Sequence, residues 1–240
     1  MTGRIRRHPF VAGVLGAGLV LGGIWVAKLV QLARSSSTHA AYWSQPQGEA
    51  GGLLYVALGD SAAQGIGASD PQHGYVALLA ARLRQASGRP VEVVNLSSSG
   101  ACIGDVLDDQ VPALDALSRT PDIVTVAVGG NDVRAYGRAT FAAQAEQLAA
   151  ALPDGAYVAD APYFMHGRWE RDAAEAGQLL RQAAQSEGLR PAGLHRAQQA
   201  QGWQAMFTSF AADWFHPNDR GHRVWADAFW QEMAEDAAGL

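Results

Sequence analysis

Short apolar runs alternate with stretches of helical periodicity along most of the chain. Each run is as long as a strand, and its nearly continuous hydrophobicity is typical of parallel strands that are buried on both faces. Four such strands are predicted at Leu53 to Leu58, Val91 to Leu96, Ile123 to Val128 and Ala156 to Ala161. A weaker fifth strand is predicted near Leu189 to Leu194.

Apolar residues spaced as on one face of a helix lie between and after these strands. The predicted helices lie at Val76 to Leu83, Leu107 to Leu114, Phe141 to Leu152, within Trp169 to Ser186, and from Asn218 or Asp219 to Glu235. Thr140 is the expected cap of the third helix. Strands that alternate with helices form right-handed crossovers. The sequence therefore predicts a three-layer α/β sandwich, with a parallel sheet of about five strands covered on both faces.

The amino-terminal part of the chain differs from the rest. Three arginines precede Phe10 to Ala27, a segment without charge, which has about the length of the roughly 20 residues that cross a bilayer. We therefore predict a transmembrane anchor within residues 1–34, with its amino end in the cytoplasm and the folded domain outside it. A signal peptide cleaved near Ala40 is the alternative. Residues 35–52 are small and polar and are predicted to be a linker to a domain over residues 53–240.

Charge narrows the range of partners. The first 34 residues hold five of the 18 basic residues and no acidic one, so the remainder has 13 basic and 23 acidic residues, a net charge of −10. Nucleic acid and anionic lipid surfaces would repel such a domain, which favours a neutral or small partner. The single Cys102 excludes an internal disulfide, so the core alone must hold the domain together.

Polar clusters follow three of the predicted strands. Asp60-Ser61 follows the first strand, Ser97 to Gly100 the second, and Asn131-Asp132 the third. The carboxyl ends of parallel strands meet at one edge of a sheet, so these clusters are expected to converge there. A late segment, Asp213 to Pro217, has the spacing Asp-x-x-His, which lets its two side chains meet within one turn.

These residue types suit nucleophilic catalysis. A serine hydroxyl is a weak nucleophile until a base takes its proton, and an imidazole oriented by a carboxylate is such a base. Ser61, His216 and Asp213 supply the three roles. The backbone N–H groups of Ser61 and Gly100 and the side-chain amide of Asn131 are candidate donors for the oxyanion of a tetrahedral intermediate.

Four short blocks in this chain resemble the motifs of the SGNH (GDSL-type) hydrolases. In chain order they are Gly59-Asp60-Ser61, Gly100, Gly129-Gly130-Asn131-Asp132 and Asp213-Trp214-Phe215-His216-Pro217. Together they are far more specific than any one of them. The resemblance spans about Leu53 to Met233 and implies a flavodoxin-like sheet and metal-free ester hydrolysis. It assigns Ser61 as nucleophile, His216 as base, and Gly100 and Asn131 to the oxyanion hole. Ala62 departs from the residue in the family's name, which leaves the subfamily open.

Other interpretations of the same residues are weaker. Asp213, His216, Asp219 and His222 recur every third residue, a spacing that suits metal ligands on one face of a helix, but Pro217 interrupts any helix that would align them. Gly65-x-Gly67 lacks the third glycine of a dinucleotide fingerprint. We therefore predict neither metal nor cofactor. An aromatic set is expected to be core rather than ligand site, although its position also makes it the best candidate for a substrate wall: Trp203, Phe207, Phe210, Trp214 and Phe215.

The sequence thus predicts a membrane-tethered serine esterase that acts on a small-molecule, glycan or lipid ester. Two rivals remain. One is an O-acyltransferase or carbohydrate deacetylase acting on envelope polysaccharide through the same acyl-enzyme. The other is a non-catalytic binding module, because fold alone does not establish activity.

Overall fold

The computed structural model describes residues 22–240 with the exception of 24, 27, 28, 31 and 34. Most of the predicted membrane anchor within residues 1–34 therefore lies outside the described residues. Within the part that the structure describes, no helix is both long and apolar enough to cross a membrane.

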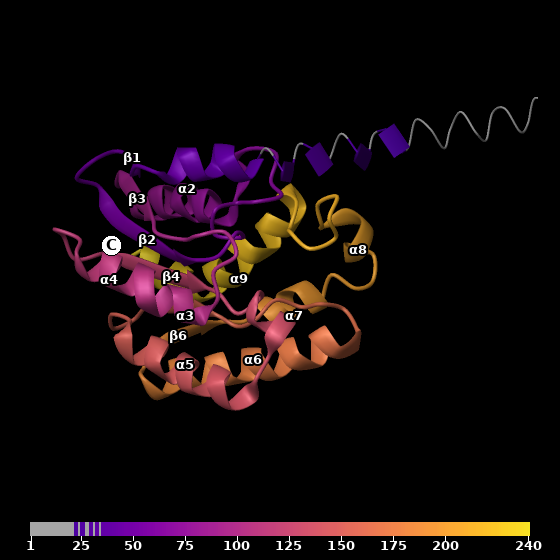
Figure 1. Ribbon diagram of the computed structural model, residues 1–240. Coiled ribbons are helices and arrows are strands. Elements are labelled where there is room, and N and C mark those ends of the chain that lie inside the picture. The colour runs from indigo at the N-terminus through magenta and orange to yellow at the C-terminus, as the bar shows by residue number, and fades with distance from the viewer. Residues whose placement is uncertain (1–21, 24, 27–28, 31, 34) are drawn as a thin grey trace, which may run out of the picture.

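A six-stranded sheet forms the centre of the protein, with strand order β1-β3-β2-β4-β5-β6 (Figure 1). Its strands are β1 (Gln47–Gly48), β2 (Leu53–Gly59), β3 (Val91–Asn95), β4 (Ile123–Ala127), β5 (Tyr157–Ala159) and β6 (Arg190–Ala192). The short β1 pairs antiparallel with β3, whereas the other five strands run parallel. Counted from β2, the parallel strands have the order 2-1-3-4-5, as in flavodoxin.

Helices cover both faces of this sheet because every residue of β2 is buried and successive side chains point to opposite faces. Leu53, Tyr55 and Ala57 pack in the core below α2 (Tyr75–Ser87) and α9 (Asp219–Ala237). Alternate side chains of the same strand pack in a second core, below α5 (Arg138–Ala151) and α6 (Gly167–Ser186). The predicted three-layer α/β sandwich is confirmed, and its sheet is mostly parallel, with five parallel strands and the antiparallel β1 at one edge (Figure 1).

Two predicted helices differ in detail. The helix expected at Leu107 to Leu114 is a run of α3 (Ile103–Asp105), the π-helical turn η2 (Val106–Gln110) and α4 (Val111–Asp115). Pro112 falls in the first turn of α4 and has no N–H to donate to the preceding turn, so a regular α-helix cannot continue through it. Thr140 does not cap α5, because that helix begins earlier, after Gly137.

The segment predicted as a linker, residues 35–52, is instead part of the folded body. Residues 35–43 and the described residues of 22–33 are helical and are here called the N-terminal helix. The side chains of His39 and Trp43 are buried. Trp43 Nε1 donates to the backbone oxygen of Gln64 at 3.1 Å, and β1 extends the sheet. Two buried aromatic rings within a small, polar stretch therefore attach it to the loop that follows β2.

Two further helices lie outside the sequence-based prediction: α7 (Leu194–Gln199), which follows β6, and the short α8 (Ala205–Thr208). In Figure 1, α8 lies at the side of the molecule from which the N-terminal helix extends. Short 3-10 turns, η1 (Pro71–His73) and η3 (Asp132–Ala135), follow the first and third parallel strands.

Candidate active site

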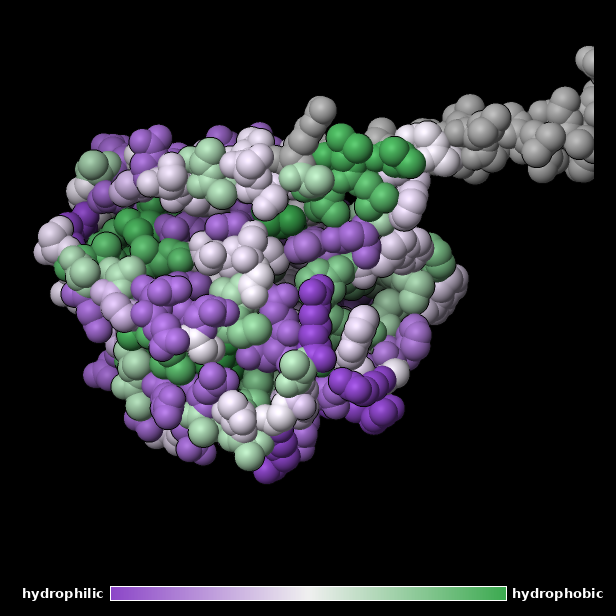
Figure 2. Space-filling model, in the orientation of Figure 1, coloured by the Kyte–Doolittle hydropathy of each residue, from purple (hydrophilic) through white to green (hydrophobic). Residues whose placement is uncertain are grey.

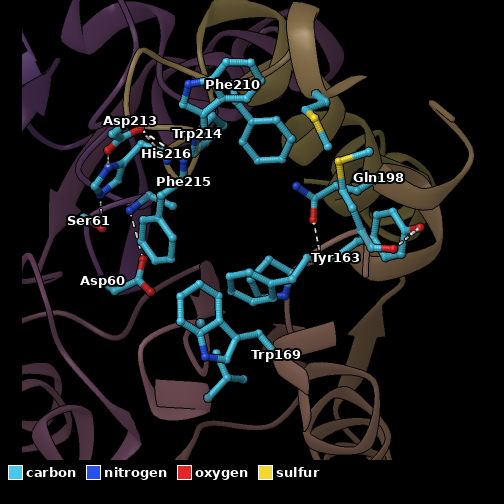
Figure 3. Close-up of a pocket in the computed structure, with 18 of the residues that line it drawn as sticks. Asp60, Ser61, Tyr163, Trp169, Gln198, Phe210, Asp213, Trp214, Phe215 and His216 are labelled. Carbon is cyan, nitrogen blue, oxygen red and sulfur yellow. Dashed lines mark hydrogen bonds and ion pairs between the residues drawn. The ribbon is translucent and has the colours of Figure 1, made fainter. Parts of the chain in front are cut away.

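Three segments that are distant in the sequence meet at the carboxyl edge of the sheet. Ser61 follows β2 directly, Asn131 follows β4, and His216 lies in the loop before α9. His216 Nε2 lies 3.0 Å from Ser61 Oγ, and His216 Nδ1 lies 2.5 Å from Asp213 Oδ2. These three side chains form a continuous hydrogen-bonded relay from the serine hydroxyl to a carboxylate (Figure 3).

The Asp213 side chain and the turn around it hold His216 in place. Asp213 Oδ1 accepts hydrogen bonds from the N–H groups of Phe215 and His216, both at 3.1 Å. The His216 carbonyl accepts from the Ala211 N–H at 2.8 Å. Asn218 then closes the loop, because its N–H donates to the Ser209 carbonyl and its side chain caps α9. The Asp-x-x-His spacing thus forms a tight turn, as the sequence predicts.

Glycines next to Ser61 permit close backbone contacts. Gly59 has φ +144°, and a Cβ there would lie 2.2 Å from the Ala127 carbonyl oxygen of the neighbouring strand. Gly67 has φ +93°, and a Cβ there would lie 2.3 Å from the Pro217 carbonyl oxygen and 3.0 Å from His216 Cβ. Gly59 and Gly67 therefore allow the loop that bears Ser61 to pack against the sheet and against the loop that bears His216. This packing role accounts for them without the dinucleotide binding considered from the sequence.

The candidate oxyanion donors lie around the same point. Asn131 Nδ2 donates to the Ala101 carbonyl at 3.0 Å and approaches Asp60 Oδ2 at 3.4 Å. Ala101 follows Gly100 and Asp60 precedes Ser61 in the chain, so this amide links the loops that carry the other two candidate donors. Within the described range, the N–H groups of Ser61 and Gly100 donate no hydrogen bond to another protein group.

A cavity of about 500 Å³ opens in front of Ser61. Ser61, His216 and Asp213 lie on one side of it, and Tyr163 and Gln198 lie on the other (Figure 3). Large apolar residues supply much of the rest of its lining: Val133, Phe164, Met165, Trp169, Met206, Phe210, Trp214 and Phe215. The cavity lies within the range of about 300–1,000 Å³ that ligand pockets usually occupy.

The wall opposite Ser61 comes from the segment that follows β5, Pro162 to His166. The Tyr163 N–H donates to Gln198 Oε1 at 2.9 Å, and the Phe164 N–H donates to Glu170 Oε2 at 2.7 Å. Side chains of α7 and α6 therefore hold this wall. Sequence reasoning missed it, although its position after the fourth predicted strand is a signal that could have indicated it.

Comparison with known protein families gives a match that includes these site residues. A model described as the GDSL-like Lipase/Acylhydrolase family matches residues 57–224, which include Ser61, Asn131, Asp213 and His216. The chain belongs to this family. The resemblance to the SGNH hydrolases is confirmed, and the chain is a carboxylic ester hydrolase.

Solved structures agree with the fold of this GDSL-like hydrolase. An alpha/beta hydrolase enzyme from the metagenome of Lake Arreo, Spain, is 25% identical, with a TM-score of 0.60 over 78% of this chain and 95% of its own. TesA is 25% identical, with a TM-score of 0.61 over 76% and 98%. An acetylxylan esterase from Geobacillus stearothermophilus is 21% identical, with a TM-score of 0.60 over 75% and 94%, and shows similarity of fold alone. No curated protein sequence matches the chain.

Burial shapes the ionisation of two carboxyl groups in the hydrolase. Loss of solvation raises the pKa of Asp60 to about 6, against the opposing effects of the Ala62 N–H and of His216. Burial acts on Asp213 in the same direction, but the hydrogen bonds and charge of His216 and the two backbone N–H donors outweigh it and lower its pKa. Asp213 is therefore an anion across the neutral range, as a partner of an imidazole must be.

The four residues that invited a metal interpretation do not act together in the hydrolase. Asp219 accepts from Ser69, whereas His222 is fully buried, and its ring lies 3.1 Å from the Ile66 carbonyl through Nε2. Burial lowers the pKa of His222 to about 4, so this ring is neutral and joins α9 to the serine loop. Among the described residues, no three potential ligands are grouped as a metal ion requires.

Proposed function

We propose that this chain is a serine esterase that forms an acyl-enzyme on Ser61, with His216 as base and Asp213 as the carboxylate behind it. The observation that carries the proposal is the relay, with 3.0 Å between Ser61 Oγ and His216 Nε2 and 2.5 Å between His216 Nδ1 and Asp213 Oδ2. Family membership supports ester hydrolysis, and the relay supports this chemical route to it.

The reaction proceeds in two halves. Ser61 Oγ attacks the ester carbonyl carbon while its proton passes to His216 Nε2, and Asp213 stabilises the resulting imidazolium. The tetrahedral intermediate then loses the alcohol, which takes the proton from His216. In the second half, a water gives a proton to His216 and attacks the acyl carbon, so that the carboxylic acid leaves and Ser61 regains its proton.

We propose Ser61, Gly100 and Asn131 as the oxyanion hole. The two backbone N–H groups are free donors among the described residues, and Asn131 would exchange its 3.4 Å contact with Asp60 for a shorter bond to a developing negative charge. Such bonds strengthen as charge forms in the transition state, and the loss of one donor typically costs about 2.7–4 kcal/mol.

A small-molecule, glycan or lipid ester is the proposed class of substrate, without nucleic acid as partner and without cofactor. The lining of the cavity is rich in aromatic and aliphatic side chains, which favours an apolar acyl or alcohol group. Transfer of the acyl group to a sugar hydroxyl, or removal of acetyl groups from envelope polysaccharide, uses the same intermediate. The acetylxylan esterase among the similar structures gives this candidate its support.

The decisive experiment combines labelling with turnover. A fluorophosphonate is expected to modify Ser61, located by peptide mapping, and the protein is expected to hydrolyse short p-nitrophenyl esters. Ser61→Ala should abolish both, whereas Ser118→Ala, which alters an exposed serine in the loop before β4, should change neither. Labelling at another serine, or unchanged turnover in Ser61→Ala, would contradict the proposal. Analysis of the products with a glycan acceptor present separates hydrolysis from transfer.

We also propose that the hydrolase is anchored in a membrane with its catalytic domain outside the cytoplasm. The support is the arginine-rich start and the charge-free segment Phe10 to Ala27. Protease added to intact cells or spheroplasts should then digest the domain while cytoplasmic markers survive. Release of a form that begins near Ala40 would identify the cleaved signal instead.

A further inference from the structure

Three aromatic side chains next to the catalytic cavity are exposed to solvent. Trp203, Phe207 and Trp214, here called the aromatic ridge, are 71%, 65% and 52% exposed. Their rings contact one another in sequence, with centroid distances of 6.2 Å and 5.6 Å. Burial of a large apolar side chain stabilises a protein by about 1.5–3 kcal/mol, so three exposed neighbours indicate a surface that meets another phase or partner.

The backbone adds to the cost of this arrangement. Trp214 adopts φ +60°, a left-handed conformation that is unfavourable for a bulky residue. The loop that bears it also holds Asp213 and His216, and Trp214 lines both the catalytic cavity and a neighbouring groove of about 640 Å³. Met206 and Phe210 line both as well. The ridge therefore stands at the mouth of the cavity.

The shape of the ridge disfavours a sugar chain as its partner. A pyranose ring packs flat against an aromatic face, and an extended glycan needs several faces in one plane. The rings of Trp203 and Phe207 lie at 84° to each other, and those of Phe207 and Trp214 at 83°. Perpendicular rings make a compact apolar projection, which suits insertion into a soft apolar phase.

The N-terminal helix lies against the same loop. Trp25 Nε1 donates to the Ala212 carbonyl at 3.2 Å, two residues from Trp214. Trp25, Val26 and Val30 of this helix are themselves exposed. Figure 1 shows the helix leaving the body on the side of α8, and Figure 2 shows hydrophobic residues gathered where it leaves. In the sequence, Trp25 and Val26 lie at the end of the charge-free segment Phe10 to Ala27, and Val30 follows it after Lys28.

We propose that the aromatic ridge and the exposed residues of the N-terminal helix form one membrane-contact surface, which holds the mouth of the cavity against the neutral interface of a lipid bilayer. Tryptophan is enriched at this depth because its ring is apolar and its N–H is polar. Arg220 and Arg223 line the adjoining groove, where lipid phosphates can approach them. The acidic body disfavours a strongly anionic surface, so the bilayer is a zwitterionic one.

The consequence for substrate rests on the proposed function. An ester dissolved in the bilayer would reach Ser61 from the ridge through the part of the cavity lined by Met206, Phe210 and Trp214, without crossing water. The substrate class is then a lipid or another ester that partitions into membranes.

A site-specific fluorescent label tests the surface without any catalysis. In the full chain with Cys102→Ala, an environment-sensitive dye is placed at Phe207→Cys on the ridge or, as a matched control, at Ser118→Cys in the exposed loop before β4. With phosphatidylcholine vesicles brominated on their acyl chains, emission at 207 should shift to the blue and be quenched, while emission at 118 stays unchanged. Equal behaviour of the two labels overturns the proposal, as does a response at 207 to soluble polysaccharide but not to vesicles.

Turnover tests the consequence. Neither Trp203 nor Phe207 lines the catalytic cavity. The double variant Trp203→Ser/Phe207→Ser should therefore hydrolyse a water-soluble short ester at the rate of the unchanged protein, and should lose roughly tenfold or more on an ester held in phosphatidylcholine vesicles. An equal loss on both esters would overturn the role of the ridge. If neither ester is hydrolysed by the unchanged protein, the proposed function fails, and the label still decides whether the ridge meets lipid.

Discussion

The two sides of the cavity are built in different ways. On one side, the carbonyl groups of Ser61 and His216 accept backbone N–H groups, and glycines such as Gly67 leave no space for a side chain. On the other side, the wall from Pro162 to His166 is held by long side chains such as Gln198. The first construction tolerates little displacement, as proton transfer requires. The second can change with its side chains, and we infer that it sets the fit of the substrate.

Asp213→Asn should produce the largest effect. The asparagine oxygen keeps the bonds from the Phe215 and His216 N–H groups, so the loop is preserved. Its NH₂ group, however, faces His216 Nδ1 and favours the tautomer whose Nε2 carries a proton and cannot accept one from Ser61. We expect kcat to fall by about 10⁴-fold with little change in Tm. Asp213→Ala also removes the oxygen that accepts the Phe215 and His216 N–H groups, so it should lower both kcat and Tm. A small loss of kcat in Asp213→Asn would contradict the role of the relay.

Asp60→Asn, on the catalytic side of the cavity, should make the protein more stable to unfolding at neutral pH. Burial raises the pKa of folded Asp60 from 3.8 to about 6, so the folded protein binds this proton more tightly than the unfolded chain. Stability is therefore lost as pH rises from about 4 to about 6 and remains lost above, by about 3 kcal/mol. The variant has no such charge, so in urea unfolding it should match the original protein at pH 4 and exceed it at pH 8. The two proteins share His222, whose titration cancels in the comparison. A gap that does not grow with pH would refute this account of Asp60.

Gly67→Ala should disturb the contact between the serine and histidine loops. The new Cβ would meet the Pro217 carbonyl at 2.3 Å and displace His216, which lies 3.0 Å away. A displacement of about 1 Å can cost about 10²-fold, so we expect kcat/KM to fall by this order. Gly88→Ala is the matched control: its φ is +67°, but nothing lies within 4 Å of the added Cβ. It should reduce stability and leave kcat/KM unchanged, and equal activity of the two variants would show that the contact at Gly67 is unimportant.

The same contrast explains what the sequence could predict. The candidate site residues are short-range signals. Ser61 and Asn131 each follow an apolar strand, so strand order alone brings them to one edge, whereas the four-residue spacing pairs His216 with Asp213 but does not place them. Strands β2 to β5 were predictable from nearly continuous hydrophobicity. The signal for β6 was weak because its residues are Arg-Pro-Ala, and β1, only two residues long, has no such signal.

The remaining features depend on tertiary contacts that have no period in the sequence. His39 and Trp43 attach an apparently polar linker to the body through the Gln64 carbonyl, a backbone group that no pattern identifies. Trp203 and Phe207 look like core residues by composition, yet the short α8 leaves them exposed. The expectation that they form core is therefore wrong, and their exposure is the basis of the proposed membrane surface.

Gln198→Ala should give the smallest effect and should act on the wall alone. The side-chain oxygen of Gln198 accepts the Tyr163 N–H at 2.9 Å, and a hydrogen bond of this kind contributes about 0.5–1.5 kcal/mol to the stability of the wall. We expect KM for an ester with a long acyl chain to rise by a few-fold, while kcat on an acetyl ester stays constant, because the relay on the other side is untouched. Gln199→Ala removes the neighbouring, exposed side chain of α7 and should change neither value. If Gln198→Ala instead lowers kcat on the acetyl ester, the wall and the relay are mechanically coupled, and the division of the cavity into a rigid catalytic side and an adjustable substrate side does not hold.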